Sequence, residues 1–306
     1  MKKSFAKTDK QHRFVAVRRP KQPQSDDTQS ENANTILLEG QIAVQAALQA
    51  NSRRVDQIII SSKRSRKSRH PNQRANQRNQ AIQAIERLAQ QAEIPVEYLN
   101  ESAFQGCLQK YSEDQKQGGT HGGIVALAGS RHFVPVDTLI KTGQTPFVVM
   151  LDGIEDPFNF GHTVRALYAA GMNGLVVRPR NWMTATNVVI RASAGATEYV
   201  ETAIADSVES AVATFRKHGC HIACTGMGED VRVTSLYEAD LTKPLFLLIG
   251  GEKRGITRSF IEQADSLLQI PYNNPFDYSL GTTAAAAVLG FEVMRQRQSR
   301  KDESEL

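Results

Sequence analysis

The spacing of apolar and polar residues predicts an orderly series of helices and strands that begins near Ile36. Apolar residues recur at helical spacing in LLEGQIAVQAALQA, whereas VDQIIIS has the short apolar run of a buried strand. In order, the expected elements are a helix in 37–50, a strand in 55–61, a helix in 81–92, a strand in 94–99, a helix in 102–109 and, after a Gly-rich turn, a strand ending near Gly129. This alternation is typical of a small α/β domain.

A second α/β unit is expected after residue 145. A buried strand is predicted by PFVVMLD, and the helix that follows carries Val164, Leu167 and Tyr168 on one face before Gly171 stops it. The next strand is GLVVRP, and two strands joined by a helix normally pair in parallel. Further strands are expected in 221–227, 244–251 and 267–271, and further helices in 208–217, 257–264 and 282–297. We therefore predict a parallel sheet with helices on both faces.

These patterns divide the chain into segments with different expected properties. Residues 1–33 are polar, charged and short of large apolar side chains, which predicts a disordered basic leader. Apolar periodicity also weakens between the two α/β units, where Pro and Gly reappear. The expected segments after the leader are an α/β domain in 34–130, a linker in 131–145, the larger α/β domain in 146–298 and a tail in 299–306.

Composition narrows the class of protein. Of the 306 residues, 40% are hydrophobic, which suits a globular protein with two sizeable cores. No stretch approaches the roughly 18 apolar residues of a membrane span, and the basic first residues lack the apolar core of a secretory signal. Cys107, Cys220 and Cys224 form no disulfide framework, as is usual in a reduced cytosol. We expect a cytoplasmic protein without a membrane partner.

The formal net charge is only +5, but its distribution points to a polyanion. Residues 61–80 contain basic side chains and no acidic one, and such patches attract nucleic acid because each neutralised phosphate releases counterions. A solvated loop that only aids solubility is the alternative. His121, in the Gly-rich turn, is a further candidate, although capping or core packing would equally explain it. The RNA-binding candidates are Lys63, Arg64, Arg66, Lys67, Arg69 and His121.

Three strand ends carry unusual loops, in 151–171, 247–257 and 269–292. Ligand sites in parallel sheets gather at the carboxyl ends of the strands, so these loops are expected to meet. No G-x-G-x-x-G follows a strand and no P-loop is present, which disfavours dinucleotide or P-loop chemistry. Alternation along HIACT places Cys220 and Cys224 on a buried face and His221 opposite, without a fourth ligand nearby, so no metal site is predicted.

Four motifs of a known family occur in the chain, three of them in these loops. In order, the chain reads DPFNFGHTVRALYAAG, RASAGATEYV, IGGEKRGI and IPYNNPFDYSLGTTAAAAVLGFE. These motifs, between Pro146 and about Arg297, resemble the SpoU/TrmH RNA 2′-O-methyltransferases of the SPOUT superfamily. The preceding segment with its THGGIVA end is similar, more loosely, to the ribosomal-protein-like substrate-binding domain of many members. The resemblance implies a deep C-terminal trefoil knot, S-adenosylmethionine as methyl donor, rRNA or tRNA as substrate, and a homodimer formed through the knotted domain.

The resemblance also implies the site residues. The donor would be held largely by backbone groups, and glycine lets the main chain approach a ligand closely. The cofactor-binding candidates are Gly226, Ile249, Gly250, Gly251, Ile270 and Leu280. The catalytic candidates are Arg165, Asn159, Glu252 and Ser279.

Each catalytic candidate has an expected role. Arg165 matches the motif arginine, and because a guanidinium is almost never deprotonated, we expect it to grip a phosphate and orient the 2′-hydroxyl. Asn159 would position that arginine or the substrate, or cap its helix. Glu252 would orient Arg165 or the donor loop, or lie on the surface, and Ser279 would hydrogen-bond near the donor or the hydroxyl.

One position departs from the family pattern. The family reads Ser-Leu-Asn where this chain has Gly281 in place of the asparagine. Either a neighbour such as Thr282 or Asn274 replaces the missing amide, or activity is weak or lost. The predicted function is methyl transfer from S-adenosylmethionine to a ribose 2′-hydroxyl of structured RNA, without metal. The alternatives are a non-catalytic RNA-binding paralogue and an RNA base methyltransferase. The small residues in 193–196 predict close packing of a turn against the sheet.

Overall fold

The computed structural model describes residues 35–62, 71–111, 121–179, 186–226, 232–251, 258–275 and 277–304. The described residues all belong to the larger compact unit of the chain, Asn34–Leu306. The predicted basic leader lies outside the described residues. Within the described residues, no helix is both long enough and apolar enough to cross a membrane.

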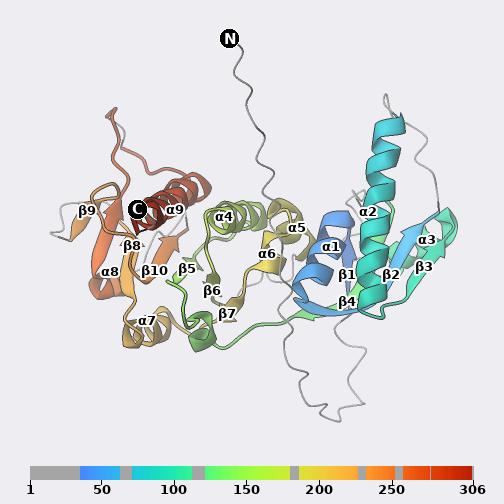
Figure 1. Ribbon diagram of the computed structural model, residues 1–306, viewed down its shortest axis with the longest axis horizontal. Coiled ribbons are helices and arrows are strands. Elements are labelled where there is room, and N and C mark those ends of the chain that lie inside the picture. Colours follow the sequence, from blue (N-terminus) through green and yellow to red (C-terminus); the bar gives the residue numbers. More distant parts are fainter. Residues whose placement is uncertain are drawn as a thin grey trace. The chain divides into compact units, whose positions relative to one another are not determined.

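The first part of the larger unit is a four-stranded sheet with the strand order β1-β4-β2-β3. Strand β4 runs antiparallel to β1 and β2, whereas β3 is parallel to β2. The elements are β1 (Ile36–Glu39), α1 (Gln41–Ala50), β2 (Arg53–Ser61), α2 (Pro71–Gln91), β3 (Val96–Leu99), α3 (Glu101–Tyr111) and β4 (Ile124–Arg131), as labelled in Figure 1.

The start of this sheet corrects the prediction of one helix over 37–50. Residues Leu37 and Leu38 lie in strand β1, and each belongs to a different hydrophobic cluster because neighbouring strand residues point to opposite faces. Gly40 then adopts a positive φ of 92°, which ends the strand, and helix α1 begins only at Gln41.

The second part is a seven-stranded sheet with the strand order β7-β6-β5-β10-β8-β11-β9, in which every named pair is parallel. Its first half comprises η1 (Val136–Leu139), β5 (Phe147–Asp152), α4 (Pro157–Ala169), β6 (Gly174–Val177), α5 (Thr186–Ala192), α6 (Ala196–Tyr199) and β7 (Thr202–Ile204). Its second half comprises α7 (Val208–Lys217), β8 (His221–Thr225), β9 (Val233–Ser235), β10 (Leu245–Gly250), α8 (Arg258–Gln263), β11 (Ser266–Gln269) and α9 (Thr282–Ser304).

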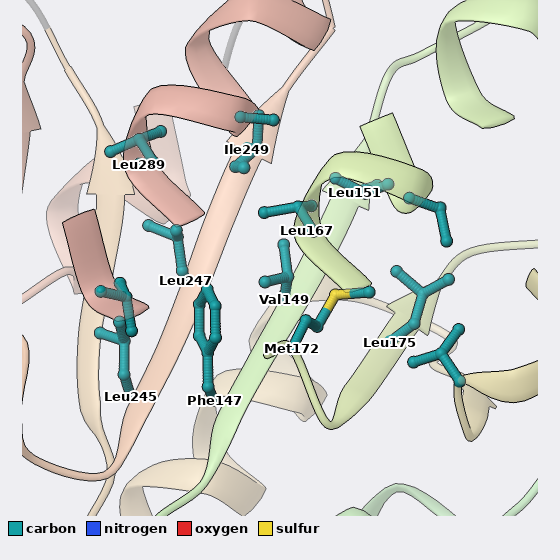
Figure 2. Packing of buried hydrophobic residues seen from close by; sticks show 14 of the residues in the cluster. Phe147, Val149, Leu151, Leu167, Met172, Leu175, Leu245, Leu247, Ile249 and Leu289 are labelled. Atoms are coloured by element: carbon teal, nitrogen blue, oxygen red, sulfur yellow. The ribbon is translucent and has the colours of Figure 1, made fainter. Parts of the chain in front are cut away.

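Helices cover both faces of this parallel sheet, so the predicted fold class is confirmed. Alternate residues of the central strands feed two separate hydrophobic clusters. Figure 2 shows one of them, where side chains of β5 and β10 pack against Leu167 of α4 and Leu289 of α9. The other cluster includes Phe215 of α7 and packs against Ile261 of α8. The trefoil knot implied by the resemblance stays a prediction.

The segment that contains α5 and α6 joins the two sheets. Asn187 donates from Nδ2 to the carbonyl oxygen of Leu37 (2.8 Å) and accepts from the main chain of Glu39 (3.1 Å). Residues 193–196 were predicted to pack against the sheet, but Gly195 in this segment packs against helix α1. A Cβ added to Gly195 would lie 2.8 Å from the Cβ of Ala46 in α1, so this turn is packed tightly against the first part of the chain.

Candidate active site

Helix α4 brings two of the catalytic candidates to the end of β5. Asp156 accepts a hydrogen bond from the main-chain N–H of Asn159 (2.7 Å), and Pro157 follows the cap, so a favourable N-terminus fixes where the helix starts. The cap of α4 is therefore Asp156 and not Asn159. Val164 is fully buried on the inner face of the helix, whereas Arg165 is exposed.

The guanidinium of Arg165 forms no hydrogen bond or ion pair with the residues that the structure describes. Among the described residues, no carboxylate forms a structural salt bridge with Arg165. An exposed guanidinium presents several N–H donors in a planar fork that suits a phosphate. Arg165 thus presents an exposed guanidinium at the surface of α4.

The ends of β5 and β10 lie side by side. Gly250 is in register with Asp152 at the carboxyl ends of these strands, and Ile249 just before it is buried. Gly251 is packed against the main chain of Gly153 so closely that an added Cβ would overlap the carbonyl oxygen of that residue. Only glycine fits at position 251, and the first two motif loops meet there.

Two further cofactor candidates follow β8, which pairs with β10, and β11, which pairs with β8. Gly226, after β8, donates its N–H to Leu268 of β11 (3.1 Å), and Ile270 follows β11 against the sheet's hydrophobic cluster. Gly226, Gly250 and Ile270 therefore lie at the carboxyl ends of β8, β10 and β11, respectively, where parallel sheets bind ligands.

The third motif loop leads from β11 to α9. Ser279 and Leu280 are exposed there, and the main-chain N–H of Leu280 donates to the hydroxyl of Tyr272 (2.9 Å), which ties the two ends of the loop together. At the start of α9, the hydroxyl of Thr282 lies 3.4 Å from the carbonyl oxygen of Gly250. The loop that holds two site candidates is thereby connected to the end of β10.

Two further hydroxyls at this junction were not among the sequence-based candidates. The Oγ1 atom of Thr283 lies 3.3 Å from Oγ1 of Thr163 and 3.4 Å from the carbonyl oxygen of Asn159. Threonines are common at the start of a helix, so their presence gave no signal. The only signal in this stretch was Gly281, which stands where the family has asparagine.

Several predicted site residues fall elsewhere. Glu252 and the basic candidates Lys63, Arg64, Arg66, Lys67 and Arg69 lie outside the described residues. Nδ1 of His121 accepts from the main chain of Gly123 (2.9 Å), and its ring packs at 5.1 Å from Phe104. Burial lowers the pKa of this imidazole. The geometry gives His121 a role in holding its turn, and contact with RNA stays a prediction.

No group of His, Cys, Asp or Glu within the described part of the chain could hold a metal ion. Cys220 and Cys224 are buried in the sheet, and burial raises the pKa of the Cys224 thiol to about 12. Nε2 of His221 is paired instead with the hydroxyl of Ser266 (2.8 Å).

Comparisons with known proteins give the same assignment as the motifs. A family model described as the SpoU rRNA Methylase family matches residues 146–291. The 23S rRNA (guanosine-2'-O-)-methyltransferase RlmB of Yersinia pestis is 32% identical over 192 residues, which are 61% of this chain and 76% of that protein. The protein of the same name from Shewanella oneidensis is 30% identical over 201 residues, or 65% of this chain and 80% of that one.

The fold is also similar to solved structures. The SpoU methyltransferase AviRb from Streptomyces viridochromogenes, in complex with the cofactor AdoMet, matches with a TM-score of 0.65. The match has 19% sequence identity and covers 87% of this chain and 92% of AviRb, so it shows a common fold. Together with the identity to RlmB across most of that protein's length, these findings show that the chain belongs to the SpoU rRNA methylase family.

Proposed function

We propose that this protein methylates a ribose 2′-hydroxyl of structured RNA with S-adenosylmethionine as the methyl donor. The observation that carries the proposal is the convergence of the motif loops. Helix α4, which bears Arg165, and the end of β10 both contact the first residues of α9. Membership of the SpoU family supports the same activity and the same donor.

The residues at the strand ends fit such a donor. Bound S-adenosylmethionine supplies an electrophilic methyl group on a sulfonium. Gly226, Gly250 and Gly251 offer main-chain groups without side chains in the way, and the tight contact of Gly251 with Gly153 shows that the chain has no room for a Cβ there. Ile249, Ile270 and Leu280 would complete the donor site.

The exposed residues of α4 and of the third loop would handle the substrate. Arg165 would bind the phosphate next to the target nucleotide and hold the ribose hydroxyl in line with the methyl group. Asn159 would position Arg165 or the ribose, and Ser279 would hydrogen-bond to the hydroxyl or the donor. Glu252 would orient Arg165. Side chains fixed in this way raise the rate by holding the reacting groups in one geometry.

The RNA is ribosomal or transfer RNA in this proposal. The relatives named above are 23S rRNA methyltransferases, which favours rRNA. The basic run in 61–80 and His121 would add phosphate and shape recognition from the 34–130 domain.

We further propose a cytoplasmic homodimer formed by the knotted domain. Phe158 on α4 and Phe291 on α9 are exposed on two helices that pack together, and they would lie in such an interface.

A methyl-transfer assay tests this function. The purified protein is incubated with S-adenosylmethionine carrying a tritiated methyl group and with unmodified rRNA or tRNA, and label in the RNA is counted. We expect transfer by the natural sequence and loss of transfer in Arg165→Ala, with unchanged donor affinity in calorimetry. The matched control is Arg216→Ala, an exposed arginine on α7, which covers the other face of the sheet. Donor binding without transfer to any RNA would instead identify a non-catalytic RNA-binding paralogue.

A further inference from the structure

The first two residues of α9 carry hydroxyls that contact two different parts of the site. The helix starts where the N–H of Ala285 bonds to the carbonyl oxygen of Gly281 (3.0 Å). Consecutive helical residues are about 100° apart around the axis, so Thr282 and Thr283 point in different directions. Thr282 contacts the end of β10, and Thr283 contacts α4.

The contact of Thr283 fixes the turn of α4 that presents the catalytic candidates. Its hydroxyl meets the carbonyl oxygen of Asn159 and the hydroxyl of Thr163, which is fully buried. Arg165 is only two residues further on and points outward from the same helix. A rotation or shift of this turn would therefore move Arg165 and Asn159 together.

The opposite side of the same turn is already held by close packing. A Cβ added to Gly161 would lie 2.6 Å from the Cβ of Ala192, so α4 and α5 approach each other without a gap. At the far end of the contact with α9, Gly290 lies against Ala170, with 3.0 Å between an added Cβ and that methyl group. Between these apolar contacts, the hydroxyl of Thr283 provides a polar link from α9 to the turn that contains Asn159.

Thr282 contacts the strand end that is predicted to bind S-adenosylmethionine. Its side chain is buried, and Oγ1 lies 3.4 Å from the carbonyl oxygen of Gly250. A buried hydroxyl needs an acceptor, and here the acceptor is a main-chain group of the predicted donor site. Gly281 itself has no side chain with which to bridge the two regions.

We propose that Thr283 is a positioning residue for Asn159 and Arg165, and that Thr282 positions the donor loop at Gly250. The two hydroxyls lie directly after Gly281, where the family's asparagine amide is missing. The inference rests on the proposed methyl transfer, because it divides the work of that site between two neighbouring side chains.

The test uses isosteric variants of the full chain. Thr283→Val should lower kcat between about 10- and 100-fold, because small shifts of positioned groups slow a reaction by such factors. Its Kd for S-adenosylmethionine should stay within about twofold of the wild-type value, which is less than the loss of one hydrogen bond would cause. Thr282→Val should raise the donor Kd about fivefold, the effect of one hydrogen bond, while kcat at saturating donor is retained. Thr283→Ser should restore most of the rate.

Two further measurements separate positioning from general damage. Hydrogen exchange should speed up in the first turns of α4 in Thr283→Val, with little change in Tm. The control is Thr214→Val, which removes a comparable hydroxyl contact, 3.0 Å to the carbonyl oxygen of Ser210, from the surface of α7. It should leave rate, affinity and α4 exchange unchanged.

The outcomes distinguish this inference from the proposed function. A wild-type protein that transfers methyl groups, with Thr283→Val equally active and equally protected in α4, would overturn the positioning role alone. A fall in Tm and donor affinity parallel to the fall in kcat would likewise show a merely structural role. If the wild-type protein transfers no methyl group, the proposed function fails, and α4 exchange with donor calorimetry still decides whether each hydroxyl holds its loop.

Discussion

A buried ion pair allows the stability of the fold to be predicted in some detail. Arg53 of β2 pairs with Glu198 of α6 at 2.7 Å, and the two side chains are only 3% and 1% exposed. Glu198 also accepts from Nε of Arg53 (2.9 Å) and from the hydroxyl of Ser52. The pair therefore links the first sheet to the helices beside the second.

The perturbation is Glu198→Ala, which leaves the charge of Arg53 buried without a carboxylate. Breaking a buried pair from one side costs roughly 3–5 kcal/mol. At roughly 2–4 °C per kcal/mol for a domain of this size, Tm should fall by about 6–20 °C. The double variant Arg53→Met with Glu198→Leu removes both charges of the pair and should recover part of that loss, because the nearby charge of Arg131 stays without its carboxylate.

The assay is thermal and urea unfolding followed by circular dichroism. The control is Glu262→Ala, which removes the exposed pair with Arg258, whose side chains are 92% and 61% exposed, and should cost less than about 1 kcal/mol. The reasoning is refuted if Glu198→Ala unfolds at the wild-type temperature, or if the double variant is as unstable as the single one.

The pH dependence has a definite sign. Burial pushes the pKa of Glu198 upward, but the hydrogen bonds and charge of Arg53, with Arg131 and Ser52, outweigh it and hold the pKa below its ordinary value. The stability from this carboxylate is therefore complete above its unfolded-state pKa of about 4.3 and is lost as the pH falls through the folded-state pKa. The difference in stability between wild type and Glu198→Gln should shrink over that acidic range.

Two other substitutions test the donor site and the C-terminal helix. Gly251→Ala should weaken donor binding in calorimetry at least tenfold, roughly 1.4 kcal/mol, because the new Cβ collides with Gly153, whereas Gly106→Ala, with open space around it, should bind normally. Arg297→Met removes hydrogen bonds of 2.8–3.2 Å to the carbonyl groups that precede β5 and β10, and it should lower the unfolding free energy by roughly 2–4 kcal/mol in urea titrations. An equal effect of Arg300→Met, which loses one exposed hydrogen bond, would contradict this assignment to Arg297.

The sequence predicts the central strands of the second sheet well because they are buried on both faces. Such strands appear as continuous apolar runs, and PFVVMLD and PLFLLIGG coincide with β5 and β10. The three-residue strands β7 and β9 were not predicted, since so short a segment has no measurable period. In β1, two adjacent leucines fitted a helix as well as a strand, and only the pairing with β4 decides between them.

In the candidate site, too, some features could be predicted from the sequence and others could not. Motif resemblance located the strand ends after β5, β10 and β11, because each leads into a recognisable loop. The partner of Thr283 is 120 residues away at Thr163, and Arg53 is 145 residues from Glu198. Spacing along the chain carries no signal for contacts of this kind, which arise only when the sheets and helices have packed.

The most direct test of the proposed function is the position of the transferred methyl group. RNA is incubated with the protein and S-adenosylmethionine that carries a deuterated methyl group, digested to nucleosides and analysed by mass spectrometry. The proposed function predicts that the label is found on the ribose 2′-oxygen of one nucleoside, and that Arg165→Ala gives none. Label on a base instead, from a protein that binds the donor normally, would contradict it.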